Sequence, residues 1–275
     1  VGKFTDDLSR LFRILFLGLF DLTIETRVAI RMIQSLDRVV IDNRRKLVAI
    51  ELASRGATVF ATARALEKCQ PLVDEIQAAG GTAFAAVLDV ADPQDFARVI
   101  ETIVDQEGRL DVLVNNAAIM FVGEYYDMDP EIIDHLVRTN LTGVMTGSLF
   151  AYRQMRRQGH GRILNISSIG GFMPNASMSA YGATKFGVRG FSDSLAAEAQ
   201  EYGVEVQVAF LGLIESEMLE KAEAVNPGAT QVHDVIPFRP QPTGIAASRI
   251  VRGLERGDRA IFTPGYARLF WYGQR

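Results

Sequence analysis

From residue 38 onward, short hydrophobic runs alternate with longer segments of mixed polarity. The short runs are rich in Val, Ile, Leu and Ala and mostly lack polar alternation, which is typical of strands buried on both faces. This pattern predicts strands at Arg38–Ile41, Ala57–Ala61, Thr82–Leu88, Leu110–Val114, Arg162–Ile166, Val204–Phe210 and Ala260–Thr263. Helices are predicted at Leu66–Ala79, Pro93–Glu107, Pro130–Arg157 and Ala180–Tyr202. The alternation predicts an α/β fold, a doubly wound parallel sheet in three layers, α/β/α.

Residues 1–37 do not follow this alternation. Apolar residues recur there at helical spacing and predict an amphipathic helix within residues 8–22. Three interpretations stay open. The helix packs on the body or on a second subunit; it contacts a membrane surface peripherally, with Arg10 and Arg13 beside its apolar run; or the segment has no native role. We therefore expect an N-terminal helical extension over 1–37 and a single domain over 38–275.

Composition narrows the class of protein. The 275 residues carry a formal net charge of −4, with 48% hydrophobic and 23% charged residues, as in soluble globular proteins. The slightly acidic balance argues against nucleic-acid binding. A lone cysteine, Cys69, cannot form an intrachain disulfide, so we expect a cytoplasmic protein, with membrane association as the alternative. The scattered histidines lack metal-ligand spacing, and no metal is expected.

Candidate chemistry lies at the carboxyl ends of the predicted strands and on the last long helix. Tyr181 and Lys185 are four residues apart, so both side chains lie on one helix face. A nearby ammonium favours the phenolate and makes a tyrosine a better acid–base catalyst near neutral pH. Ser168 follows a buried strand, where its hydroxyl faces the ligand crevice or caps a turn.

Two asparagine sites add to this pattern. Asn115-Asn116-Ala117-Ala118 follows the strand that ends at Val114, where small alanines allow a flat ligand to approach. Asn140 falls inside a predicted helix, where asparagine is disfavoured. We expect it to bend that helix through a bond between its side chain and the backbone.

Together these elements resemble the short-chain dehydrogenase/reductase family over roughly residues 38–265. The resemblance implies a Rossmann-like fold and hydride transfer between a nicotinamide cofactor and a carbonyl or alcohol. It implies that Tyr181 exchanges a proton with the substrate oxygen and that Ser168 stabilises the charge on that oxygen. It assigns Lys185 to the nicotinamide ribose and Asn140 to a water in the proton relay.

The resemblance also assigns a set of cofactor-binding residues: Arg64, Asp89, Val90, Asn116, Ala117, Tyr181, Lys185, Ile214 and Ser216. No acid follows the second strand to bind a ribose 2′-hydroxyl, whereas Arg64 is placed to pair with a 2′-phosphate. NADP is therefore expected, and NAD less so; the alternative is that Arg64 is a solvated surface residue. The resemblance implies a homodimer or homotetramer, and apolar residues within 217–240 suggest a small apolar carbonyl or alcohol as substrate.

One departure from the family concerns the first βα turn, which normally carries a glycine-rich phosphate loop. Residues 42–48 contain no glycine, and the family pattern resumes at Ile50. Three interpretations stay open. Arg44, Arg45 and Lys46 replace backbone contacts with charge; the chain is a cofactor-impaired homologue that acts as a binding or structural protein; or residues 1–46 are not the ancestral segment.

Overall fold

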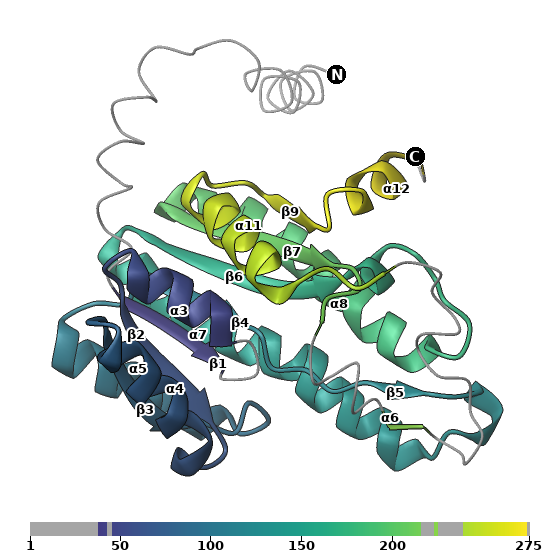
Figure 1. Ribbon diagram of the computed structural model, residues 1–275, viewed down its shortest axis with the longest axis horizontal. Helices are drawn as coiled ribbons and strands as arrows, with labels where there is room; N and C mark the ends of the chain where they lie inside the picture. The colour runs from purple at the N-terminus through teal and green to yellow at the C-terminus, as the bar shows by residue number, and fades with distance from the viewer. Residues whose placement is uncertain (1–37, 43–45, 216–222, 225–238, 274–275) are drawn as a thin grey trace, which may run out of the picture. The chain divides into compact units, whose positions relative to one another are not determined.

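The computed structural model describes residues 38–42, 46–215, 223–224 and 239–273; the predicted helix within residues 8–22 lies outside them. Seven parallel strands form one sheet in the order β3-β2-β1-β4-β6-β7-β9 (Figure 1). The strands are β1 (Arg38–Asp42), β2 (Thr58–Ala63), β3 (Thr82–Val87), β4 (Val112–Asn115), β6 (Gly161–Ser168), β7 (Val204–Leu211) and β9 (Ala260–Thr263). Each of the seven predicted strands is present, and the α/β prediction is confirmed.

Helices cover both faces of this sheet. One face packs against α3 (Lys46–Ser54), α4 (Leu66–Ala78) and α11 (Thr243–Glu255), and the other against α5 (Pro93–Glu107), α7 (Gly143–Gln158) and α8 (Ser179–Ala199). Successive side chains of a strand point to opposite faces. In β4, Val112 and Val114 accordingly join the first hydrophobic cluster and Leu113 joins the second. The three predicted layers follow from this alternation.

The predicted helix over residues 130–157 is divided in the structure. It comprises α6 (Pro130–Val137), a π-helical turn over Arg138–Thr142, and α7. Asn140 lies in the π-helical turn and bonds to backbone outside the helix, as its position in the sequence predicted. Such single π turns often occur at functional sites.

Several elements were not predicted. Besides α3 and α11, the structure contains α12 (Ala267–Gly273) and a short parallel pair formed by β5 (Phe121–Val122) and β8 (Glu223–Ala224). Two-residue strands have no period that a sequence pattern can reveal. The β5–β8 pair joins the chain after β4 to the segment that follows β7.

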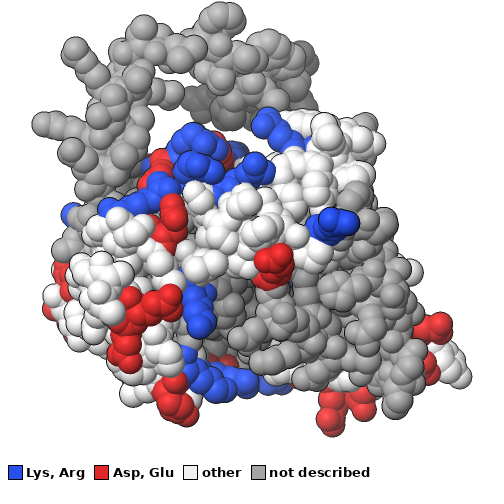
Figure 2. Space-filling model, viewed as in Figure 1, with Lys and Arg blue, Asp and Glu red and all other residues white. Residues whose placement is uncertain are grey.

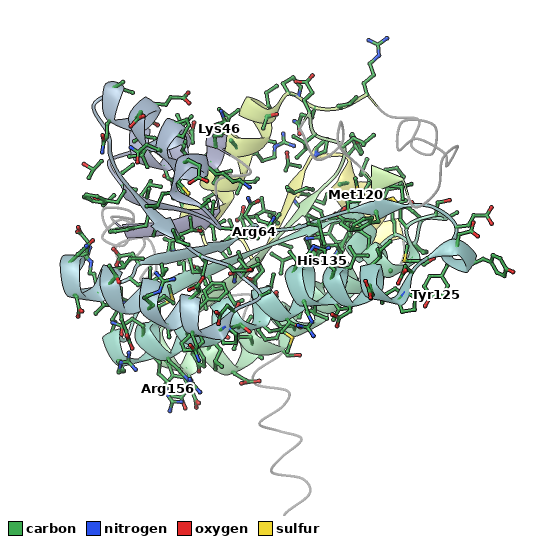
Figure 3. All side chains as sticks on the ribbon, turned by 90° about the horizontal axis from the view of Figure 1, so that it is seen from below. Lys46, Arg64, Met120, Tyr125, His135 and Arg156 are labelled. Carbon is green, nitrogen blue, oxygen red and sulfur yellow. The ribbon has the colours of Figure 1, made fainter. Side chains whose placement is uncertain are left out.

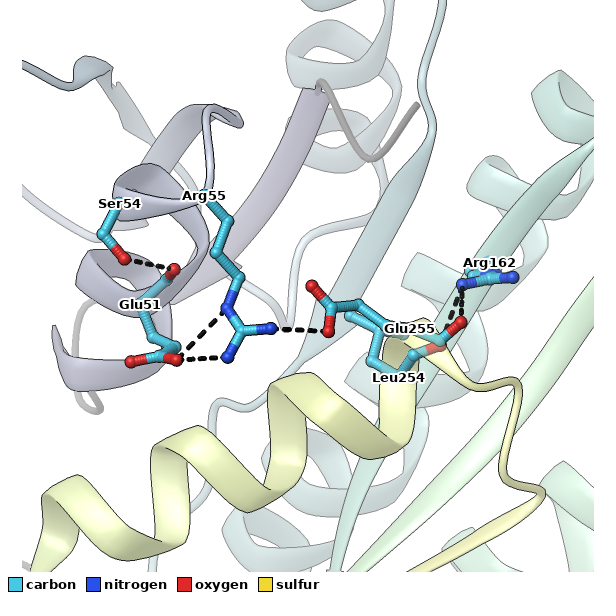
Figure 4. Close-up of polar contacts among 6 residues, drawn as sticks. All are labelled: Glu51, Ser54, Arg55, Arg162, Leu254 and Glu255. Atoms are coloured by element: carbon cyan, nitrogen blue, oxygen red, sulfur yellow. Dashed lines mark hydrogen bonds and ion pairs between the residues drawn. The ribbon is translucent and has the colours of Figure 1, made fainter. Parts of the chain in front are cut away.

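Helix α3 is held against α11 at its C-terminal end (Figure 4). Arg55 directly follows α3, and its guanidinium forms ion pairs with Glu51 of α3 and with Glu255 of α11, with nitrogen–oxygen distances of 2.5 Å. Arg162 of β6 donates to the carbonyl oxygens of Leu254 and Glu255, which end α11. Core packing and the Arg55–Glu255 ion pair therefore hold α3 against α11.

The surface carries both signs of charge. On the face shown in Figure 2, Lys and Arg side chains are interspersed with Asp and Glu among the described residues. Within the described part of the chain, no helix combines the length and the hydrophobicity needed to cross a lipid bilayer.

Candidate functional site

A pocket opens at the carboxyl ends of β2 and β4, where a doubly wound sheet binds ligands. Three of the predicted cofactor-binding residues line it, namely Val90, Asn116 and Ala117. A Cβ on Gly143 would lie 2.9 Å from the carbonyl oxygen of Val90, so only glycine allows this close approach in the pocket wall. The remaining lining residues are Thr62, Leu88, Phe96, Leu113, Val114, Asn115, Thr139 and Val144. Its wall is mostly apolar, with a few amides and hydroxyls.

Asn115 is the last residue of β4, and Asn116 directly follows it. The side chain of Asn115 is bonded inside the core, where its Nδ2 donates to Asn165 Oδ1 at 2.8 Å and to Ser148 Oγ at 3.0 Å. These buried bonds join β4 to β6 and α7. Asn115 therefore fixes the strand end from which Asn116 and Ala117 reach the pocket.

Asp89 lies beside the pocket without lining it. Its side chain accepts from the backbone N–H of Ala91 at 2.9 Å, and its own N–H donates to Asp95 Oδ2 at 2.9 Å. That N–H, together with Arg98, lowers the pKa of the Asp95 carboxyl below its usual value. The charge on Asp95 thus holds the chain at Asp89, next to Val90.

Two basic side chains lie exposed near this edge of the sheet. Arg64 follows the last residue of β2, and Lys46 is the first residue of α3 (Figure 3). Within the described residues, Arg64 has no ion pair with an acid. Arg44, Arg45 and Ser216 lie outside the described residues.

Asn140 connects the pocket to α8. Its amide bonds to both backbone polar groups of Ile119, each at 2.8 Å, and its Nδ2 lies 3.3 Å from Thr184 Oγ1. The Thr184 hydroxyl donates to the carbonyl of Tyr181 at 2.7 Å. Thr139, the neighbour of Asn140 in the π-helical turn, lines the pocket. The turn therefore contacts both the pocket, through Thr139, and α8, through Asn140.

Ser168 and Tyr181 face the same space. A Cβ built on Gly170 would lie 3.6 Å from both Ser168 Oγ and Tyr181 Cε1. Ser168 is the last residue of β6, and its Oγ accepts from the N–H of Gly170 at 3.1 Å. The serine therefore both caps a turn and borders the tyrosine, so the two roles considered from the sequence are compatible.

Lys185 and Tyr181 lie on the buried face of α8. The ammonium of Lys185 is 5.8 Å from the centroid of the Tyr181 ring and donates to the carbonyl oxygen of Ile166 at 3.0 Å. Ile214 follows β7, where its backbone bridges to Gln241, and its side chain joins the first hydrophobic cluster. The structure thus brings Ser168, Tyr181 and Lys185 together.

Three threonines at this site were not singled out from the sequence. Thr62 and Thr139 line the pocket, and Thr184 joins Asn140 to the backbone of Tyr181. Thr62 could have been found from the sequence, because it directly follows the predicted strand Ala57–Ala61 and stands two residues before Arg64. The other two are threonines inside helical turns, which sequence spacing does not distinguish from solvent-facing ones.

Comparison with known proteins gives consistent findings. Residues 46–226 match the family model described as short chain dehydrogenase. The chain is similar to the 3-oxoacyl-[acyl-carrier-protein] reductase of Escherichia coli (strain K12), with 37% identity over 173 residues, which are 63% of this chain and 70% of that protein. The corresponding enzyme of Staphylococcus aureus (strain Mu50) is 38% identical over 174 residues, with 63% and 71% covered.

Solved structures resemble it as well. A short-chain dehydrogenase from Streptomyces avermitilis superposes with a TM-score of 0.76 and 27% identity, over 87% of this chain and 92% of that chain. A metagenomic short-chain oxidoreductase in complex with NADP gives a TM-score of 0.69 and 28% identity, over 83% and 97%.

Proposed function

Because the chain belongs to the short-chain dehydrogenase family, we propose that it is an NADP-dependent oxidoreductase that interconverts a carbonyl and an alcohol. The observation that carries this proposal is the shared space between Ser168 and Tyr181, with the Lys185 ammonium behind the tyrosine. An acid–base hydroxyl, a second hydroxyl and a cation are the groups that proton transfer to a carbonyl oxygen needs.

In this proposal the pocket takes the adenosine end of a dinucleotide, because Ala117 and Gly143 place little or no side chain in its wall. When bound, the nicotinamide supplies or accepts the hydride. In reduction, Tyr181 gives its hydroxyl proton to the substrate oxygen, and in oxidation it takes that proton back. Ser168 donates a hydrogen bond to the same oxygen as its charge develops.

Lys185 has two tasks in this proposal. Its ammonium favours the phenolate of Tyr181, and it binds the hydroxyls of the nicotinamide ribose. Asn140 is proposed to hold a water behind the lysine, from the turn that also places Thr139 in the pocket. Ile214 and Ser216 are proposed to contact the nicotinamide end.

Arg64 supports NADP over NAD. It is exposed beside the pocket and pairs with no described acid, and a guanidinium is well suited to a ribose 2′-phosphate. A structural neighbour of 28% identity was solved with NADP.

We propose a small apolar carbonyl or alcohol as substrate. Tyr181 packs in a hydrophobic cluster with Met120, Met178 and Leu213, so the tyrosine faces an apolar surface on that side. Methionine side chains adapt to ligands of several shapes. The relatives named above reduce 3-oxoacyl groups, which also join a carbonyl to an apolar chain.

The assembly that we propose is a homodimer or homotetramer. Helices α7 and α8 expose Met145, Leu149 and Phe186, each more than 40% accessible, which is a reason for a second copy to cover them. Size-exclusion chromatography with light scattering tests this, and Leu149→Arg is expected to dissociate the assembly. A wild-type chain that runs as a monomer would contradict it.

A second candidate function follows from the first βα turn. Residues 42–48 contain no glycine, and the match to the family model starts at Lys46, the first residue of α3. The absence of glycine from this turn favours a cofactor-impaired homologue that acts as a binding or structural protein.

Thermal unfolding with added nucleotide separates the two functions. Binding to the folded state raises the melting temperature by mass action. We expect NADPH to raise it, and we expect Tyr181→Phe to abolish turnover of apolar ketones while keeping this NADPH-dependent rise. If millimolar NADPH and NADH both leave the melting temperature unchanged, the second candidate function is correct.

A further inference from the structure

The backbone and the side chain of Lys185 are both attached to β6. Its carbonyl oxygen accepts from Ser167 Oγ at 3.0 Å, and its ammonium donates to the carbonyl of Ile166 at 3.0 Å. Ser167 and Lys185 are each only 2% exposed, so water does not compete for these bonds. The two attachment points are consecutive in β6 and directly precede Ser168.

Gly171 lies against both partners of the Ser167–Lys185 bond. A Cβ on Gly171 would lie 2.4 Å from Ser167 Oγ and 2.8 Å from the carbonyl oxygen of Lys185. Any side chain there would push the serine and the helix apart. Gly171 therefore permits the Ser167–Lys185 bond, and it lies in the turn that carries Gly170 between Ser168 and Tyr181.

We propose that Ser167 is a positioning residue for the reaction. Its hydroxyl fixes the α8 backbone at Lys185, which keeps the ammonium beside Tyr181 and keeps Tyr181 opposite Ser168. Ser167 has no contact with substrate or cofactor in this proposal and acts only through Lys185. The inference rests on the proposed function for its catalytic consequence, and on the hydrogen bonds of Ser167 and Lys185 to β6 and α8 for its geometry.

Two serines of α8, Ser192 and Ser194, provide control substitutions that test whether Ser167 contributes only to stability. Ser192 is also buried at 1% exposure between α8 and β6, where its hydroxyl donates to the Val188 carbonyl at 2.6 Å and accepts from Asn165. Ser194 makes the same type of helix bond, to Gly190, on the exposed face. Loss of the Ser192 hydroxyl removes a buried bond of α8 that does not involve Lys185.

The experiment compares Ser167→Ala, Ser192→Ala and Ser194→Ala in the full chain with NADPH bound. Tyrosines carry a ¹³C label at the ζ-carbon, and Tyr181→Phe identifies the Tyr181 signal among the seven tyrosines. We expect Ser167→Ala to shift this signal and its titration midpoint, while both other variants leave them as in the wild type. We expect kcat to fall about tenfold in Ser167→Ala, because small misplacements at a reacting centre are costly.

A second pair of variants perturbs the same contact from the opposite side. Gly171→Ala keeps the Ser167 hydroxyl but separates it from α8, so it should reproduce the Tyr181 shift. Gly190→Ala is its control, because a Cβ there meets no atom within 4 Å. These variants keep the proposal testable if one of them folds poorly.

The outcomes separate this inference from the proposed function. If Ser167→Ala and Ser192→Ala lower the melting temperature equally and neither moves the Tyr181 signal, the inference is wrong. If the wild type shows no turnover but Ser167→Ala alone moves that signal, the positioning role holds and the oxidoreductase proposal fails.

Discussion

The side-chain amide of Asn140 pairs with both backbone polar groups of Ile119. Its Nδ2 donates to the Ile119 carbonyl and its Oδ1 accepts from the Ile119 N–H, each at 2.8 Å. Asn140 is fully buried, and it lies in the π-helical turn between α6 and α7. One side chain therefore joins the turn that borders the pocket to the segment after β4.

Asn140→Ala is expected to lower the free energy of unfolding by about 1–3 kcal/mol, because it leaves both Ile119 groups without their partner. Urea denaturation measures this loss. Thr142→Ala, exposed on the same turn, is the control and should change stability by less than about 0.5 kcal/mol. Equal losses in the two variants would show that the Asn140–Ile119 pair contributes nothing particular.

Arg64 should decide between the two nicotinamide cofactors. Arg64→Ala is expected to weaken NADPH binding about tenfold or more while leaving NADH binding unchanged, because the guanidinium pairs only with the 2′-phosphate. Nucleotide fluorescence titrations measure both dissociation constants, and added salt should reduce the difference between them. Lys68→Ala, an exposed cation on the neighbouring α4, is the control. If NADPH and NADH lose affinity equally, Arg64 does not contact the 2′-phosphate.

Asp95 links stability to pH near the pocket. The Asp89 N–H and Arg98 lower its pKa, so ionised Asp95 stabilises the folded state. This stabilisation is present above the unfolded-state pKa of about 3.9 and is lost as pH falls through the lower folded-state value. Asp95→Asn should therefore be less stable than the wild type at pH 7, and the difference should shrink as pH falls below the unfolded-state pKa. Asp105→Asn, exposed on the same helix, should show no such convergence.

Much of the fold could be predicted from local patterns, because each buried strand is a short apolar run. The bonds between the Asn140 side chain and the backbone were also predictable, because asparagine is disfavoured inside a regular helix. The Ser167–Lys185 contact was not, because it depends on how α8 lies across β6 and on the absence of a side chain at Gly171. Sequence spacing fixes neighbours within one element but not the register between two.

The first βα turn yields the last prediction. Only residues 43–45 separate β1 from α3, and residues 42–48 contain no glycine. Since the Arg55–Glu255 pair and core packing hold α3 against α11, a longer turn should leave α3 in place.

Replacing residues 43–45 with a longer turn of the G-x-G-x-x-G type is expected to tighten NADPH binding about tenfold or more, because glycines allow backbone N–H groups to approach the diphosphate at the start of α3. The control is a turn of equal length with serine at each glycine position. Calorimetric dissociation constants measure the gain, and they need no substrate. If both turns weaken binding relative to the natural chain, then the charges of Arg44, Arg45 and Lys46 hold the diphosphate, and the first of the three interpretations is correct. A gain confined to the glycine turn means that the natural turn lacks the contacts on which the family relies.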